Sequence, residues 1–182
     1  MYYLAQNPDS QAKAREEVLS SLNNGKDPNM DTVMRMPYLF ACIKEAMRMN
    51  NPSNATLPRS AVVPTQLGSY TIPPNTLMMF NISALHHLES EFKEHDRFNP
   101  ERFMLVSDDN APVAFFGLGL RQCPARNFAM WELRTVTALL LKEYEWHLPK
   151  ASPHTHRVHN AFSFSTHLNL PLDLDIVFTK RQ

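Results

Sequence analysis

The chain has 182 residues, 43% of them hydrophobic and 20% charged, which predicts one globular domain with a real core and excludes a disordered chain. The 18 basic and 18 acidic residues give a net charge of zero, so nucleic acid is not expected as a partner. Two cysteines are too few for a disulfide framework, and no apolar run reaches the roughly 20 residues of a membrane span. We therefore expect the chain as given to be soluble and cytoplasmic.

The N-terminal part predicts two helices, and a proline marks the start of each. Asn7 and Pro8 fit the cap and first turn of a helix over about residues 8–22. Pro37 starts a second helix that extends to about residue 49. This second helix is apolar almost all round, which is typical of a buried helix.

The middle of the chain predicts little regular structure. Short extended runs broken by proline and glycine indicate small hairpins over about residues 57–82, and residues 84–94 return to a helix-like pattern. The stretch 98-FNPERF-103 predicts an irregular meander fixed by its proline. Together with a glycine-containing loop around Cys123, it occupies about residues 95–125.

The C-terminal part predicts one strong helix over about residues 126–144, with an apolar face made of Phe128, Ala129, Leu133, Val136 and Leu140. The tail alternates apolar and polar residues in 161-AFSFS-165 and again in 172-LDLDIVF-178. This alternation predicts a terminal β-hairpin over about residues 158–179.

The stretch 115-FFGLGLRQCPARNFA-129 places two of the four glycines of the chain just before a cysteine. Glycines allow a tight loop that approaches a flat ligand closely. Cys123 at a helix N-terminus, with Arg121 beside it, favours the thiolate form. Taken alone, Cys123 could be a small buried hydrophobic residue, which is the commonest role of a free cysteine. It could also be a nucleophile, but a nucleophile needs a base, and neither His95 nor His147 has a spacing that favours this role.

Two charged residues lie within the apolar helix over residues 37–49. Glu45 and Arg48 are three residues apart and can pair on one helix face. Glu94 and Arg97 have the same spacing but lie among other charges, which indicates a solvated surface. Because unpaired charge is costly in a buried helix, the first pair requires a third charged partner, and Arg102 is the candidate.

These elements together resemble the cytochrome P-450 (haem-thiolate monooxygenase) family. The spacing Phe116-x-x-Gly119-x-Arg121-x-Cys123 is similar to its haem-binding signature, with Ala125 where the family has a final glycine. Glu45-x-x-Arg48 and the meander arginine, Arg102, are similar to its Glu-Arg-Arg network. The resemblance implies a mainly α fold with small β-sheets. Residues 1–182 would be the C-terminal portion of one such domain, without its distal helix and N-terminal region.

The resemblance also implies a role for each of these residues. Cys123 would be the axial ligand of the haem iron, with Phe116, Gly119 and Ala125 beside it in the loop. Arg121 and Arg59 would contact the haem propionates. Glu45, Arg48 and Arg102 would lock the meander beneath the cysteine loop. No catalytic residue of the distal side would be encoded.

The implied activity is oxidation of a small, apolar organic molecule with O₂. The implied cofactor is haem b, with electrons from NADPH supplied through a reductase. Arg126, Arg134 and Lys142 would help to dock an acidic reductase, unless they form an ordinary basic helix face. The full-length protein would bind the endoplasmic reticulum membrane through an N-terminal anchor that this chain lacks.

Two alternatives stand beside this interpretation. One is a truncated protein that binds haem without catalysis. The other is a metal-binding module built on 154-HTHRVH-159, where three histidines could ligate Zn²⁺ but no fourth ligand is apparent. Because a surface loop is the simpler interpretation, replacing His154 and His156 together is expected to leave the fold and metal content unchanged.

Overall fold

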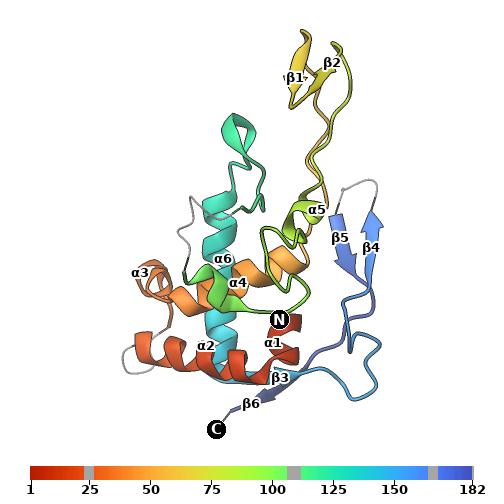
Figure 1. Cartoon of the computed structure of the whole chain (residues 1–182). Helices are drawn as coiled ribbons and strands as arrows, with labels where there is room; N and C mark the ends of the chain where they lie inside the picture. The colour runs from red at the N-terminus through yellow and green to blue at the C-terminus, as the bar shows by residue number, and fades with distance from the viewer. Residues whose placement is uncertain (23–26, 106–111, 164–167, 182) are drawn as a thin grey trace.

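Figure 1 shows the computed structural model of the chain, which describes residues 1–22, 27–105, 112–163 and 168–181. The fold is mainly helical with three small two-stranded sheets, as the sequence predicts. The helices and 3₁₀ turns are α1 (Tyr2–Gln6), α2 (Pro8–Ser21), α3 (Met30–Met34), α4 (Pro37–Met49), α5 (Ile82–His86), η2 (Pro100–Phe103), η3 (Gly119–Arg121) and α6 (Arg126–Glu143). The strands are β1 (Thr65–Leu67), β2 (Tyr70–Ile72), β3 (Tyr144–His147), β4 (Asn160–Ser163), β5 (Leu168–Pro171) and β6 (Val177–Lys180).

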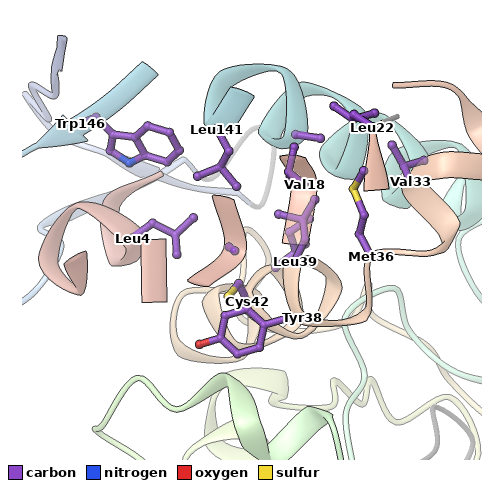
Figure 2. Packing of buried hydrophobic residues seen from close by; sticks show 13 residues of the cluster. Leu4, Val18, Leu22, Val33, Met36, Tyr38, Leu39, Cys42, Leu141 and Trp146 are labelled. Carbon is purple, nitrogen blue, oxygen red and sulfur yellow. The ribbon is translucent and has the colours of Figure 1, made fainter. Parts of the chain in front are cut away.

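The main core lies where α2, α4 and α6 pack against one another. Helix α2 contributes Ala14 and Val18, which are four residues apart and therefore share one face. Helix α4 contributes Leu39 and Cys42, and Leu141 comes from α6 (Figure 2). The predicted burial of the helix over residues 37–49 is confirmed, and α4 contacts α2, α5, α6 and η2.

Most of the predicted apolar face of α6 lies outside this core, although Leu140 packs against it. Phe128 is 63% exposed and Val136 is 50% exposed, and Leu133 is exposed as well. The opposite face of α6 contacts α2, α3 and α4 instead, through Arg134, Thr137, Ala138 and Leu141. The bounds of this helix are confirmed, but its predicted inward face is wrong, because a helix with apolar residues on two faces does not reveal which face packs.

No helix within the described residues has the length and apolar character needed to cross a membrane.

The prediction of a terminal hairpin is confirmed only in part, because the tail forms an antiparallel pair but 172-LDLDIVF-178 does not supply its second strand. Strand β4 pairs with β5. Strand β6 pairs antiparallel with β3, the strand that directly follows α6. The β3–β6 pairing places Trp146 opposite Phe178, with ring centroids 5.7 Å apart. The burial of Trp146 stabilises the β3–β6 pairing more than a local turn would stabilise a hairpin within the tail. Sequence periodicity cannot predict that a strand pairs with a distant part of the chain. Residues 164–167, within the predicted hairpin, lie outside the described residues.

Of the small hairpins predicted over residues 57–82, the structure has one, formed by β1 and β2. Strands β1 and β2 pair across Gly68 and Ser69, and Figure 1 shows them projecting from the helices on a long extended stem. Lower in the stem, Arg59 and Met78 face each other as an isolated antiparallel bridge.

The helix predicted over residues 84–94 is shorter than expected, because α5 ends at His86. The carbonyl oxygen of His86 accepts a hydrogen bond from Arg48 Nη1 at 2.7 Å. A continuing α-helix would need that oxygen for the amide four residues later. The residues that follow form turns instead.

Candidate functional site

The loop before α6 presents Cys123 at the surface. The thiol is exposed, so the interpretation of Cys123 as a small buried hydrophobic residue does not hold. Its backbone N–H donates to the carbonyl of Phe116 at 2.9 Å, which closes the loop on itself. Gly117 and Gly119 have φ values of +74° and +68°, a left-handed conformation in which a side chain would be strained.

Cys123 lines a cavity of about 520 Å³ between the cysteine loop and the stem of the β1–β2 hairpin. Most of its wall is apolar, and Arg59 and Arg121 supply its positive charge. The lining residues are Met47, Asn51, Pro52, Ser53, Ala55, Thr56, Leu57, Arg59, Ile82, Phe115, Phe116, Gly117, Arg121, Cys123, Pro124 and Leu168. Among the described residues this wall contains neither a histidine nor a carboxylate, so a nucleophilic cysteine would lack its base.

The cavity brings together four of the residues predicted from the sequence, which are Arg59, Phe116, Arg121 and Cys123. Gly119 and Ala125 do not line it. Gly119 starts the turn η3, and Ala125 is the residue just before α6.

Sequence reasoning missed several apolar and amide residues of the wall. Met47 lies in the last turn of α4, whereas Asn51 lies beyond the end of that helix, so the helix pattern could not have placed Asn51 beside it. Ile82 carries no sequence signal either, since it reaches the cavity only through the bend of the chain at the start of α5.

Glu45, on α4, is the centre of a buried charged network. Arg48 contacts both carboxylate oxygens, with Nε 2.8 Å from Oε2 and Nη2 3.0 Å from Oε1. Arg102 Nε and the backbone N–H of Asn99 each donate to Oε1 at 3.0 Å. The Glu45 and Arg48 side chains have no solvent exposure. Glu45 therefore holds two guanidinium groups that lie 54 positions apart in the sequence.

The two arginines extend this network into the backbone of the meander. Arg48 donates to the carbonyls of His86 and His95, each at 2.7 Å. Arg102 Nη1 donates to the carbonyl of Lys93 at 3.1 Å. The carbonyls of Lys93 and His95 lie in turns, and that of His86 lies at the C-terminal end of α5, where a helix leaves carbonyls without a partner. The guanidinium groups therefore supply the hydrogen bonds that a helix or sheet would otherwise provide.

The second pair with the same spacing behaves as predicted. Glu94 and Arg97 lie 3.4 Å apart, and their side chains are 67% and 73% exposed. Such a surface pair contributes at most about 1 kcal/mol. It provides a matched control for the buried pair.

The histidines of 154-HTHRVH-159 do not form a metal site, and the surface-loop prediction is wrong for His154. His154 is buried, and its ring is occupied on both sides, by the N–H of His159 at 3.1 Å and the carbonyl of Asp173 at 3.2 Å. Its own carbonyl accepts from the Tyr2 hydroxyl at 2.7 Å. No cluster of three potential metal ligands is found within the described residues.

Replacing His154 with alanine is therefore expected to destabilise the chain, contrary to the expectation from the sequence. The change removes both ring hydrogen bonds that join the tail to itself, and leaves a cavity, at a cost of about 2–3 kcal/mol in the free energy of unfolding. His156 is exposed, and His156→Ala should change it by less than about 0.5 kcal/mol. Urea unfolding of both variants measures this difference, and equal stabilities would contradict the role of His154.

The three basic residues proposed for partner docking do not share one exposed face. Arg134 is buried, with its guanidinium 3.5 Å from the ring centre of Phe40. Lys142 pairs with Asp27 at 2.9 Å. Arg126 is exposed at the start of α6. The docking prediction is therefore wrong for Arg134, which packs inside the fold.

Comparison with known proteins gives one family. The protein-family model described as Cytochrome P450 matches residues 1–170 of the chain. The chain is 35% identical over 146 residues to the 1,25-dihydroxyvitamin D(3) 24-hydroxylase, mitochondrial, of Mus musculus, a match that covers 79% of this chain and 28% of that protein. It is 32% identical over 178 residues to the ferruginol synthase of Isodon rubescens, covering 96% and 36%. It is 32% identical over 156 residues to the steroid 17-alpha-hydroxylase/17,20 lyase of Squalus acanthias, covering 83% and 31%.

The chain thus spans about a third of the length of the curated relatives it matches, with coverage from 28% to 36% of each.

Proposed function

Because the chain belongs to the cytochrome P450 family, we propose that it forms the proximal, haem-holding part of a haem-thiolate monooxygenase. One observation carries this proposal. The exposed Cys123 thiol lines an apolar cavity whose wall also contains Arg59 and Arg121. In this proposal, residues 1–182 are the C-terminal portion of one domain.

The residues present fit a haem chemically. The faces of a porphyrin are apolar, and the cavity wall offers Phe115, Phe116 and Ile82 for contact with them. The propionates are carboxylates, and guanidinium groups such as those of Arg59 and Arg121 bind carboxylates with strong hydrogen bonds. A cysteine thiolate is an established haem-iron ligand.

Each residue then has a defined task toward haem b. Cys123 supplies the thiolate ligand, and Phe116, whose carbonyl accepts the Cys123 N–H, fixes the position of that residue. Gly117 and Gly119 let the loop turn tightly, with open space where a side chain would lie. Arg59 and Arg121 neutralise the propionates. When bound, haem with a thiolate ligand supplies the chemistry of O₂ reduction and insertion of one oxygen atom into an organic substrate.

The proposed substrate is a small, apolar organic molecule, since the wall beside Cys123 is mostly apolar and relatives are named as hydroxylases of vitamin D and steroid compounds. The proposed electron source is NADPH, delivered through a reductase. Arg126, exposed at the start of α6, can contribute to docking an acidic partner. In the proposed full-length form, a membrane anchor would lie outside these residues.

Haem reconstitution tests the proposal. The purified chain is loaded with haem, reduced and exposed to CO, and its absorption spectrum is recorded. The expected result is the Soret band of thiolate-ligated haem. A spectrum of haem without thiolate ligation, or no haem uptake, would contradict the proposal.

A second candidate is a protein that binds haem but does not catalyse. It concerns these residues alone, which cover about a third of the length of each relative. A turnover assay with reductase and NADPH separates the two. A thiolate-type spectrum without substrate oxidation supports the second candidate.

Replacing Arg102 with alanine is expected to abolish stable haem incorporation. The change removes the donor to Glu45 Oε1 and to the carbonyl of Lys93, and so releases the meander. Haem content per chain after gel filtration measures the effect. Arg97→Ala, in the exposed pair, should retain the haem of the unchanged chain. Unchanged haem content in the Arg102 variant would exclude this role for the network.

A further inference from the structure

His86 is a fully buried residue at the end of α5, and both its backbone and its ring are hydrogen-bonded. Its carbonyl accepts from Arg48 of the charged network at 2.7 Å. Its ring nitrogen Nε2 lies 3.1 Å from the backbone nitrogen of Ala114. One residue thus connects the network on α4 with the segment that enters the cysteine loop.

The bond to Ala114 fixes the protonation state of the ring. A backbone N–H can only donate, so Nε2 must carry a lone pair and the proton must be on Nδ1. Burial, and then the positive charge of Arg48, lower the pKa of His86 to about 4. The imidazole is therefore neutral at ordinary pH and available as an acceptor.

The segment held by His86 leads to Cys123 through two further backbone hydrogen bonds. The carbonyl of Ala114 accepts from Gly117 N–H at 3.1 Å, and the carbonyl of Phe116 accepts from Cys123 N–H at 2.9 Å. The ring of Phe115 packs edge-on against His86, with centroids 5.1 Å apart. His86 therefore stands at one end of a continuous bonded path whose other end is the cysteine.

We propose that His86 is a positioning residue for the haem thiolate: its neutral ring holds the Ala114–Phe116 segment so that the Cys123 loop keeps a fixed place relative to the Glu45–Arg48 network. Ala114 is buried, so without His86 its N–H would have no water to replace the lost acceptor. The role toward haem rests on the function proposed above. The role in holding the loop does not require haem.

Three variants test the proposal. His86→Leu removes the acceptor but stays apolar, whereas His86→Gln can place an amide oxygen where Nε2 lies. His87→Gln is the matched control, because the His87 ring contacts the carbonyl of Ser83 and not the loop.

The first measurement is amide hydrogen exchange of the haem-free chain. His86→Leu is expected to speed exchange at Ala114 and Cys123 by about tenfold or more, with core amides of α4 unchanged. His86→Gln and His87→Gln should leave these two amides protected. A uniform increase over the whole chain, or no increase at Ala114, would overturn the proposal, since a merely structural role predicts the former.

The second measurement is the reduced-CO spectrum of each variant after haem loading. His86→Leu should lower the fraction of haem that has a thiolate ligand. His86→Gln should keep that fraction as it is in the unchanged chain. If the unchanged chain itself gives no thiolate spectrum, the proposed function fails while the exchange result still decides the role of His86. If His86→Leu does not fold, the ¹⁵N chemical shifts of the His86 ring in the unchanged chain show which nitrogen carries the proton. A proton on Nδ1 is expected, and a proton on Nε2 would overturn the proposal.

Discussion

Replacing Glu45 with alanine is expected to lower the free energy of unfolding by about 3–5 kcal/mol. The substitution leaves the guanidinium group of Arg48 buried without a counter-ion, and it removes the acceptor of Arg102 Nε and of the Asn99 backbone N–H. A buried unpaired charge costs far more than the net stabilisation of the intact pair. Urea unfolding followed by circular dichroism measures the change.

The chain supplies a control of the same chemistry and spacing. Glu94→Ala removes the partner of Arg97, and both side chains of this pair are exposed to solvent. Its effect should stay below about 1 kcal/mol. Similar losses of stability in the two variants would show that burial of the Glu45 network does not determine its contribution.

The contrast between these two pairs shows what sequence can and cannot predict here. The two pairs have the same spacing, so only the residues around each pair indicate which one is buried. Leu39, Cys42 and Ile43 predict a buried helix, whereas Lys93 and Asp96 predict a solvated surface. Local periodicity, together with proline at helix starts, also predicts α2, α4 and α6 to within one or two residues.

Contacts between distant segments could not be predicted in this way. The strand after α6 pairs with β6, and His154 bonds to Asp173 and to the start of the chain, without any periodic signal. Helix α6 shows the same limit, because packing buries Arg134 over an aromatic ring and leaves Phe128 exposed. The aliphatic part and planar head of arginine make such burial compatible with a charged residue.

The candidate site could be predicted where a short spacing carries the signal, and at Arg59, where the resemblance to a known family does. Arg121 and Cys123 belong to one short spacing, and they line the cavity. Asn51 and Ile82 line the same cavity, and so does Leu168, but they come from three separate segments. Their meeting depends on the course of the whole chain. His86 was missed for the same reason, since its partner Ala114 lies 28 residues away.

Replacing Cys123 with serine is expected to eliminate the thiolate-type spectrum completely while leaving the free energy of unfolding within about 0.5 kcal/mol. A serine hydroxyl does not provide the thiolate ligand, because its proton is far less acidic than that of a thiol. The side chain is exposed before haem is bound, so the core does not depend on it. Reduced-CO spectra and urea unfolding of the haem-free chain measure the two effects separately.

The second cysteine is the matched control with the opposite expectation. Cys42, on α4, is buried in the main core, and burial raises the pKa of its thiol to about 12, so it remains a neutral, apolar side chain. Cys42→Ala should keep the thiolate spectrum and lower the free energy of unfolding by about 1–2 kcal/mol, through the cavity that it leaves. If Cys123→Ser retained the spectrum, Cys123 would not be the haem ligand. The two variants separate the ligand from the core because each cysteine affects only one of the two measurements.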